Sequence, residues 1–247
     1  THLSSLEISE VDTLWKAIAC DFDGTLTDKE GRLSLEALTV VRESETSGIP
    51  VIISSGRDLT QLRFLSKVIG TSGPIIAENG GVVWDPRTLR KSLQVDRVKV
   101  LRAYRALLPH LCEMESIKPR LRESDIVVGG RRTLELNAIL NTDELGVHIL
   151  DANIATHITD ASVDKGIGLE TAAQILNIDP KEIVAIGDSQ NDIAMFQAAG
   201  KCFAVRNAHP LLKAQANSIT KQSFGKGCAE AIRAVLRETS PDTKLTS

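Results

Sequence analysis

The chain has 247 residues, of which 42% are hydrophobic and 25% charged, and its formal net charge is −3. This length allows one large domain or two smaller ones, and the slightly negative charge provides no basic field for binding nucleic acid. No apolar run approaches the ~20 residues that a membrane-spanning helix needs, so we expect neither nucleic acid nor a membrane as a partner.

The 4 cysteines show no paired spacing, so the sequence indicates neither a zinc site nor a disulfide framework. Cys20, Cys202 and Cys228 lie in or beside apolar stretches, which predicts that they are small core residues. We expect a cytoplasmic protein that is a monomer or a homodimer.

The first predicted strand is the apolar run 17–20, which leads directly into residues 21–28 with the sequence DFDGTLTD. Asp21 and Asp23 therefore stand at the end of a buried strand, where each carboxylate loses solvation and repels the other. A divalent cation would remove both costs, and Gly24 permits a sharp turn directly afterwards. For this stretch alone an ordinary polar turn is the alternative, because Asp and Gly are common turn residues.

Residues 16–83 alternate short apolar strands with amphipathic helices, which predicts a parallel sheet with crossover helices. After the first strand we expect a helix that ends at Gly48, a strand at 51–53, a helix that ends at Gly70 and a strand at 75–77. The strand 51–53 is followed by Ser55, Gly56 and Arg57, so a hydroxyl and a free backbone stand at its tip.

A break at Asp85 and Pro86 separates this pattern from residues 84–159, which we interpret as a small α/β domain inserted into the first. Its expected elements are a long helix carrying Val98, Leu101, Leu108 and Leu111, a strand at 126–128, a helix at 133–145, and strands at 147–150 and 155–159.

The first domain resumes at residue 160 and ends in a polar tail after Thr239. Asp164, Lys165 and Gly166 precede a stretch with Ile167, Thr171 and Ile175 at helical spacing. Taken alone, Lys165 would be an ordinary surface lysine, since most lysines are exposed.

A second acidic strand end follows. The predicted strand 183–186 runs into residues 187–192 with the sequence GDSQND, so Asp188 lies at the strand tip and Asp192 about one helical turn further on. A short helix then stops at Gly200, and later strands are expected at 202–205 and 218–220. Two acidic strand ends in one chain indicate a hard-cation site of oxygen ligands, which suits Mg²⁺.

These four pieces, in this order, resemble the motifs of the haloacid dehalogenase-like phosphohydrolases: residues 21–28, residues 55–57, Lys165 and residues 187–192. The loop 73–81, with the sequence GPIIAENGG, is similar to the Glu-Asn-Gly loop of Cof-type members, which insert a cap after the third core strand. With the short cap and residues 120–124 and 164–166, the chain looks most like archaeal-type phosphoglycolate phosphatases. Sugar phosphatases and phosphomannomutases share much of this pattern.

The resemblance implies an α/β fold with a doubly wound, Rossmann-like parallel-sheet core. We assign residues 1–83 and 160–247 to this core and residues 84–159 to the inserted α/β cap. In such a sheet, ligands collect beyond the carboxyl ends of the strands. The loop residues Glu78 and Asn79 are expected close to the hinge between core and cap.

The resemblance also implies roles. Asp21 is the expected nucleophile, which forms an aspartyl-phosphate, and Asp23 the general acid and base. Mg²⁺ would be held by Asp21, Asp23 (in the family through its backbone carbonyl), Asp188 and Asp192, the last directly or through water. Ser55, Gly56, Lys165 and Asn191 would hold phosphate oxygens.

The cap is expected to select the substrate. Arg120 and Arg122 are two residues apart, so in an extended segment they point the same way, and a guanidinium suits a carboxylate. A charged cap surface is the alternative for this pair. The predicted partner is a small phosphorylated metabolite, 2-phosphoglycolate first. A sugar-phosphate phosphatase or phosphomannomutase-like phosphotransferase of the same fold stays open, as does a non-catalytic phosphate-binding protein.

Overall fold

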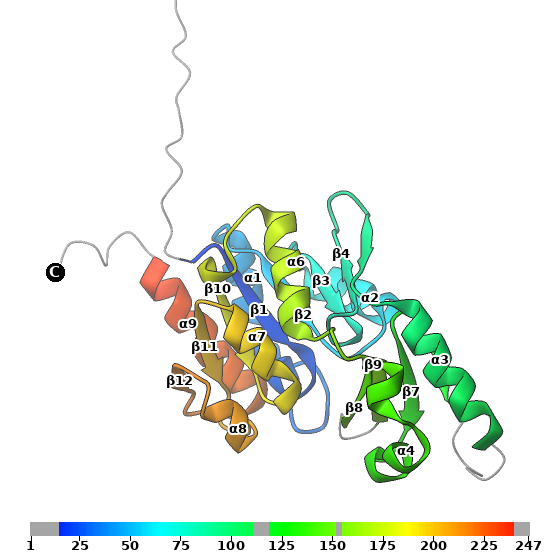
Figure 1. Ribbon diagram of the computed structural model, residues 1–247. Coiled ribbons are helices and arrows are strands. Elements are labelled where there is room, and N and C mark those ends of the chain that lie inside the picture. The colour runs from blue at the N-terminus through cyan, green and yellow to red at the C-terminus, as the bar shows by residue number, and fades with distance from the viewer. Residues whose placement is uncertain (1–14, 111–118, 152–154, 240–247) are drawn as a thin grey trace, which may run out of the picture.

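The structure is a computed structural model of the chain, and it describes residues 15–110, 119–151 and 155–239. Figure 1 shows two units, a larger one and a smaller one, and each has its own hydrophobic core. Leu111, Cys112 and the polar tail after Thr239 lie outside the described residues.

An eight-stranded sheet forms the larger unit, which we call the core unit, and its order is β12-β11-β10-β1-β2-β3-β4-β5. From β12 to β3 neighbouring strands are parallel, whereas β4 is antiparallel to both of its neighbours, β3 and β5. Strands β2 to β5 follow β1 on one side of it, and β10 to β12 lie on its other side. The strand order therefore reverses between β1 and β10, which makes this position a topological switch point. The strand bounds, in sheet order, are Ser218–Ile219, Lys201–Ala204, Ile183–Gly187, Ala17–Asp21, Val51–Ser54, Ile75–Ala77, Val82–Trp84 and Lys91–Leu93.

Helices cover both faces of this sheet. In Figure 1, α6 and α7 lie together in front of the sheet, while α1 and α9 pack together behind it. Asp58 caps the start of α2 by accepting a hydrogen bond from the Gln61 amide, and Gly70 ends it in a left-handed conformation. The helix bounds are Leu35–Thr46 for α1, Leu59–Ile69 for α2, Lys165–Leu176 for α6, Ile193–Ala198 for α7, Pro210–Lys213 for α8 and Phe224–Thr239 for α9.

The smaller unit, which we call the cap unit, is an antiparallel sheet of order β6-β7-β9-β8 with helices on one face. Its core is built around Val100, Leu107, Ile126, Leu136 and Ile158. The bounds are Arg120–Leu121 for β6, Asp125–Gly129 for β7, Val147–Asp151 for β8, Ala155–Asp160 for β9, Arg97–Leu107 for α3, Thr133–Ile139 for α4 and Thr142–Leu145 for α5.

The large sheet continues past the predicted boundary at residue 84, because β5 (Lys91–Leu93) pairs with β4 in the core unit. Asp85 and Pro86 therefore mark a hairpin turn. The Asp85 carboxylate accepts hydrogen bonds from the Arg87 amide and the Thr88 hydroxyl, which closes the turn.

The helix predicted over 133–145 is interrupted. Leu140 is extended, and Asn141 caps a new helix by accepting a hydrogen bond from the Glu144 amide.

Two predicted helices are present, but the residues that marked them in the sequence are not the ones most deeply buried. In α3 the buried residues are Val100, Ala103 and Leu107, whereas Val98 and Leu108 are exposed.

In α6, Gly168, Leu169 and Ala172 are buried, whereas Ile167, Thr171 and Ile175 are only partly so. A side chain at Gly168 would meet Ile76 and the backbone of Gly80, so this face packs on the sheet through small residues.

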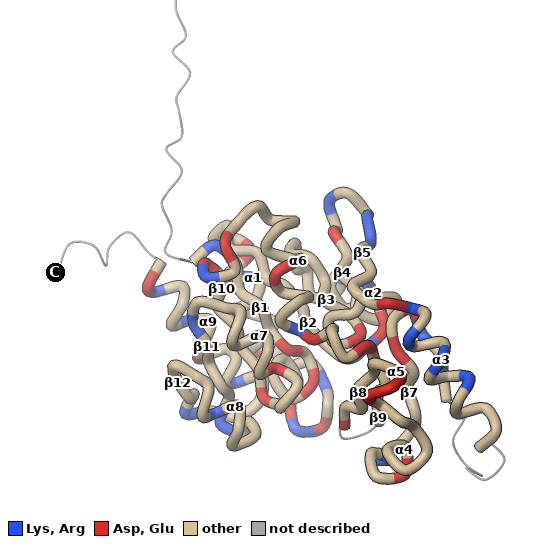
Figure 2. Tube along the Cα trace, viewed as in Figure 1, with Lys and Arg blue, Asp and Glu red and all other residues tan. Residues whose placement is uncertain are grey.

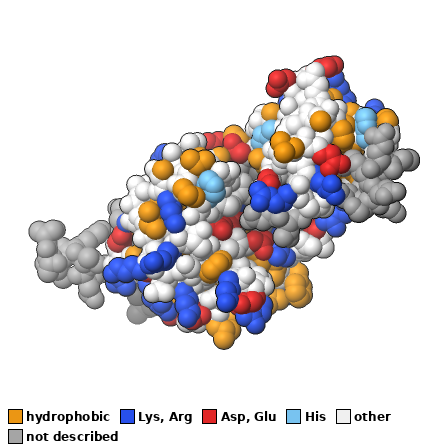
Figure 3. Space-filling model, turned by 90° about the horizontal axis from the view of Figure 1, so that it is seen from below, with side chains coloured by type: hydrophobic (Ala, Val, Ile, Leu, Met, Phe, Trp, Pro, Cys, Tyr) orange, Lys and Arg blue, Asp and Glu red, His pale blue; other side chains and the backbone are white. Residues whose placement is uncertain are grey.

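The three buried cysteines of the described chain, Cys20, Cys202 and Cys228, confirm the predicted core positions. None of the helices described by the structure is long and apolar enough to cross a membrane. In Figures 2 and 3, acidic residues gather where the two units face each other, a region that contains the carboxyl ends of β1 and β10.

The chain passes between the two units twice, near residue 96 and near residue 160. Asp160, at the end of β9, connects these two segments. Its buried carboxylate accepts hydrogen bonds from Lys99 Nζ at 2.9 Å, the Asp96 amide at 2.9 Å and the Ser162 amide at 3.0 Å. Burial alone would raise the pKa of Asp160, but the hydrogen bonds from Lys99, Ser162 and Asp96 outweigh it and lower the pKa from 3.8 to about 2.

We expect Asp160→Asn to lower the free energy of unfolding by about 2 kcal/mol at pH 7. The folded-state pKa lies below the ordinary value, so the carboxylate stabilises fully above about pH 4 and loses this effect as the pH falls towards 2. Urea unfolding at pH 7, 4 and 3 measures the difference, of which roughly half should remain at pH 3.

Asp151→Asn is the matched control, because Asp151 pairs with Arg131 on the exposed surface of the same unit. Its cost should stay below about 1 kcal/mol. Equal losses in the two variants, or a loss at Asp160 that does not change with pH, would contradict this account of the junction.

Candidate active site

The parallel register of the central strands brings the predicted motifs to one edge of the sheet. Asp21, the last residue of β1, lies beside Ser54 of β2, and Cys20 lies beside Ile186 of β10. The loops after β1, β2 and β10 therefore begin at the same edge, as the doubly wound pattern predicts.

The loop after β1 is a single turn, η1 (Phe22–Leu26), that depends on Gly24. Gly24 has a φ of +87°, and a Cβ there would lie 2.2 Å from Asp188 Oδ2. Its amide donates a hydrogen bond to Thr27 Oγ1 at 2.9 Å. Only glycine accommodates both the conformation and the approach of Asp188.

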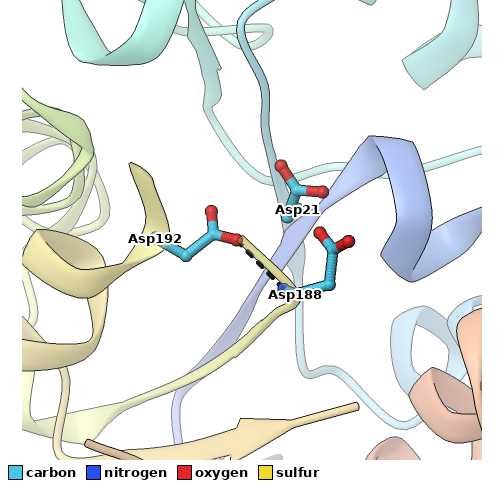
Figure 4. Close-up of side chains that lie close together, drawn as sticks. All are labelled: Asp21, Asp188 and Asp192. Carbon is cyan, nitrogen blue, oxygen red and sulfur yellow. Dashed lines mark hydrogen bonds between the residues drawn. The ribbon is translucent and has the colours of Figure 1, made fainter. Parts of the chain in front are cut away.

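A cluster of carboxylates lies at this edge (Figure 4). Asp21, Asp188 and Asp192 each offer one oxygen atom, and these atoms all lie within 4.8 Å of one another. Asp192 also stabilises its own loop, because its Oδ2 accepts hydrogen bonds from the backbone amides of Asp188 and Ser189, both at 3.0 Å. The structure thus brings together the two acidic strand ends that the sequence pattern singled out.

Lys165, the first residue of α6, supplies a buried cation to this cluster. Its Nζ donates hydrogen bonds to Asp21 Oδ1 and Asp192 Oδ1, each at 2.6 Å, and the residue is 1% exposed. Burial alone would lower the pKa of Lys165, but the carboxylates of Asp192 and Asp21 outweigh it and raise the pKa. The lysine is therefore held charged between them.

One lysine does not balance three carboxylates. Burial raises the pKa of Asp21, with Lys165 opposing and the Asp192 and Asp188 charges adding to the rise. Burial, followed by the charge of Asp192, raises the pKa of Asp188 to about 7. Asp21 Oδ2 is buried and has no hydrogen-bond partner among the described residues. This set of crowded oxygen donors fits a hard divalent cation.

Asp23 lies outside this carboxylate cluster, and its side chain is 50% exposed. Arg57 holds it in a bidentate pair, in which Nε and Nη2 donate to Asp23 Oδ2 and Oδ1 at 2.8 and 2.7 Å. The guanidinium also lies 5.1 Å from the centre of the Phe22 ring. Sequence reasoning gave Arg57 no role, although its place directly after Ser55 and Gly56 was a signal.

Ser55, Gly56 and Asn191 meet through Asn79. Ser55 is buried, and its amide donates to the Ile76 carbonyl at 2.9 Å. Asn191 Nδ2 donates to Asn79 Oδ1 at 3.0 Å, and a Cβ on Gly56 would lie 3.1 Å from that same oxygen. Asn79 thus lies between the loops after β2 and β10.

The two arginines of the cap unit have different surroundings. Arg120, on β6, is 64% exposed, and its Nη2 lies 3.6 Å from Asp58 Oδ2. Arg122 is 7% exposed and donates through Nε and Nη2 to both oxygens of Asp125, at 2.6 and 2.5 Å. Its Nη2 also lies 3.2 Å from His157 Nδ1. Of the pair, Arg120 keeps the exposed guanidinium, while that of Arg122 is held by a buried carboxylate.

Known proteins are similar to this chain in sequence and in fold. The chain matches the model of the haloacid dehalogenase-like hydrolase family over residues 18–114 and 140–232, and it belongs to this family. This confirms the relationship that the four motifs predicted.

It is 36% identical over 220 residues to a phosphoglycolate phosphatase of Methanothermobacter thermautotrophicus, with 88% of this chain and 97% of the relative covered. It is 38% identical over 219 residues to a phosphoglycolate phosphatase of Archaeoglobus fulgidus, covering 88% and 96%.

Among solved structures, Thermoplasma acidophilum 0175 superimposes with a TM-score of 0.79 at 22% identity, covering 90% of this chain and 98% of the other. A haloacid dehalogenase-like hydrolase from Bacteroides thetaiotaomicron gives a TM-score of 0.74 at 20% identity, covering 90% and 99%. These similarities confirm the predicted fold class.

We expect Asp188→Asn to make the metal-free protein more stable than wild type, by about 1–3 kcal/mol at pH 8. The folded-state pKa of Asp188 lies above its ordinary value, so ionising it destabilises the fold, and the advantage of the variant should grow as the pH rises from 4 to 8. Urea unfolding in EDTA measures it.

With added Mg²⁺ the order should reverse, because a cation that binds the folded state stabilises the wild type more than a variant with one carboxylate fewer. Glu170→Gln, on the exposed side of α6, is the control for exchanging a carboxylate for an amide. A variant that is less stable than wild type in EDTA, or equally stabilised by Mg²⁺, would contradict the charge-crowding account.

Proposed function

We propose that this protein is a Mg²⁺-dependent phosphatase that hydrolyses a small phosphate monoester through an aspartyl-phosphate on Asp21, with 2-phosphoglycolate as the preferred substrate. The observation that carries the proposal is the hydrogen bonding of the two carboxylate oxygens of Asp21. Lys165 holds one of its oxygens, while the other is buried without a partner among the described residues at the point where the strand ends meet. Membership of a hydrolase family and relatives named phosphoglycolate phosphatase support this reaction class.

In the proposed reaction, a carboxylate oxygen of Asp21 attacks phosphorus while the bond from phosphorus to the leaving oxygen breaks. Asp23 gives its proton to the leaving oxygen, and then takes a proton from the water that hydrolyses the aspartyl-phosphate. The half-exposed position of Asp23, next to the buried cluster, suits a group that must reach both leaving group and water. Arg57 orients Asp23 in its ionised form, and one of the two hydrogen bonds must open when Asp23 carries the proton for the leaving oxygen.

Mg²⁺, held by Asp21, Asp188, Asp192 and the backbone carbonyl of Asp23, would supply positive charge between the anionic nucleophile and the anionic phosphate. Lys165 adds a second, permanent positive charge, fixed by its two hydrogen bonds. Ser55, Gly56 and Asn191 would hold the phosphate oxygens, and their place on the two loops next to the cluster supports this assignment.

For substrate choice, we assign the carboxylate of 2-phosphoglycolate to Arg120. Its guanidinium is exposed and near Asp58, which follows the Ser55 loop directly. Arg122 instead neutralises the buried Asp125, so we give it a supporting role in the cap unit.

Asp21→Asn should lower kcat by more than about a thousandfold for every substrate, since an amide does not attack phosphorus. Asp23→Asn should lower kcat about 10²–10⁴-fold for 2-phosphoglycolate. The loss should be much smaller for p-nitrophenyl phosphate, whose leaving group needs little protonation. Steady-state kinetics with Mg²⁺ measure both, and EDTA should abolish wild-type activity.

Glu170→Gln is again the control and should keep wild-type kinetics. A tenth or more of wild-type activity in Asp21→Asn, or full wild-type turnover in EDTA, would refute the mechanism.

Arg120→Ala should lower kcat/KM for 2-phosphoglycolate about tenfold to a hundredfold, or about 1.5–3 kcal/mol, as expected for a lost charge-assisted hydrogen bond. The same variant should leave p-nitrophenyl phosphate nearly unaffected, because that substrate has no carboxylate. The measurement is the ratio of kcat/KM values for the two substrates.

Arg122→Ala provides the contrast, because it removes the bidentate guanidinium partner of the buried Asp125 and leaves that carboxylate, within the described part of the chain, only its contact with His157. It should destabilise the fold and change both substrates alike. Equal losses on both substrates in Arg120→Ala would refute its role, and a wild-type preference for a sugar phosphate would overturn the substrate assignment.

A further inference from the structure

A strained turn joins β3 to β4. Glu78, Asn79 and Gly80, which form the single 3₁₀ turn η2 (Glu78–Gly80), have φ values of 52°, 55° and 102°. Residues other than glycine rarely adopt a positive φ, and they keep it only where contacts with the surrounding structure hold them. Both Glu78 and Asn79 are almost fully buried, at 1% and 2% exposed. Their surroundings therefore explain why the turn is kept.

Asn79 contacts the two loops that we assign to the phosphate. Its amide donates to the Ser55 carbonyl at 3.1 Å, and its Oδ1 accepts from Asn191 Nδ2 at 3.0 Å. Its side-chain amide also lies against Gly56, where a Cβ would be 3.1 Å from Oδ1 and 3.2 Å from Nδ2. Asn79 thus links the loops after β2 and β10, with its backbone amide on Ser55 and its side chain between Gly56 and Asn191.

The remaining contacts of the turn keep Asn79 in place. A Cβ on Gly80 would lie 1.9 Å from the Asp164 carbonyl oxygen, so the turn packs directly on the start of α6. The Glu78 carboxylate accepts hydrogen bonds from the amide and the hydroxyl of Ser124 in the cap unit, both at 2.7 Å. The turn is therefore held from the core unit and from the cap unit at once.

We propose that Asn79 is a positioning residue for phosphoryl transfer, which acts by fixing the carboxamide of Asn191. The terminal torsion of an asparagine has a broad, roughly two-fold profile, and the hydrogen bond to Asn79 selects one orientation of the Asn191 amide. Displacement of a positioned group by 1 Å can lower a rate about 10²-fold. This inference rests on the proposed function, which places Asn191 against the phosphate.

Asn79→Gly tests the proposal, because glycine keeps a φ near +55° without strain while the side-chain amide is removed. Asn177→Gly is the matched control. Asn177 is also an asparagine with positive φ, 58°, but it is exposed at the end of α6. With p-nitrophenyl phosphate, Asn79→Gly should lower kcat about tenfold to a hundredfold, by the positioning argument, with a smaller change in KM. Asn177→Gly should match wild type.

The decisive comparison is the double variant. If Asn79 acts through Asn191, adding Asn79→Gly to Asn191→Ala should change kcat by less than about threefold, since the group that is positioned is already absent. Losses that multiply would overturn the proposal, as would an Asn79→Gly variant with wild-type kcat.

A second measurement needs no turnover. The side-chain amide signal of Asn191, identified by its absence in Asn191→Ala, should shift in ¹⁵N-resolved NMR of Asn79→Gly and stay in place in Asn177→Gly. An unmoved signal would overturn the inference even in an active enzyme. A wild-type protein that hydrolyses no phosphate ester would instead refute the proposed function, while the NMR result would still decide whether Asn79 fixes Asn191.

Discussion

The crowding of negative charge at the ends of β1 and β10 is the constraint on which the rest of the site depends. Three carboxylates share a space in which their oxygens lie within 4.8 Å of one another, with one buried lysine among them. Such an arrangement is unfavourable unless the scaffold supplies donors and prevents relaxation. Backbone amides at Asp188 and Ser189 supply donors, and Gly187 makes the approach possible, because a Cβ there would lie 2.7 Å from Asp192 Oδ2. The parallel sheet then keeps the strand ends from moving apart.

This constraint explains which parts of the site could be predicted from the sequence. A buried strand that ends on a carboxylate is a local pattern, and parallel topology brings such ends together, so Asp21, Asp188 and Asp192 were predictable without coordinates. Lys165 was different. Most lysines are exposed, so this residue alone gave no signal, and its two partners lie far away in the chain. Only its combination with the acidic strand ends, and then the family resemblance, assigned it to the site.

The features that sequence reasoning missed depend on contacts between separate loops. Arg57 pairs with Asp23 across 34 positions, and Asn79 with Asn191 across 112, and no periodicity encodes either pair. For Arg122, the two-residue spacing predicted a side chain that points the same way as Arg120, but β6 ends at Leu121 and the two side chains have different surroundings. The spacing does not reveal that the buried Asp125 needs a counter-charge, or that the Arg122 guanidinium forms an ion pair with it. The hairpin β4–β5 was missed for a similar reason, since the Asp85–Pro86 signal is common to domain breaks and to tight turns.

The core and cap units meet through polar contacts, while each unit has its own hydrophobic core. This separation bears on which residues can change without disturbing the carboxylate cluster. The contacts between the units include Asp58 with Arg120 and Glu78 with Ser124. The carboxylate cluster and its lysine lie entirely in the core unit, so changes on the cap surface leave the charge balance of the cluster intact. A junction of directional hydrogen bonds also fixes the position of the cap more strictly than sliding apolar surfaces would, since each bond weakens steeply outside its preferred angle. Under the proposed function, selectivity can therefore change through cap residues such as Arg120, while the turn at Glu78 and Asn79 connects the cap to the loops after β2 and β10.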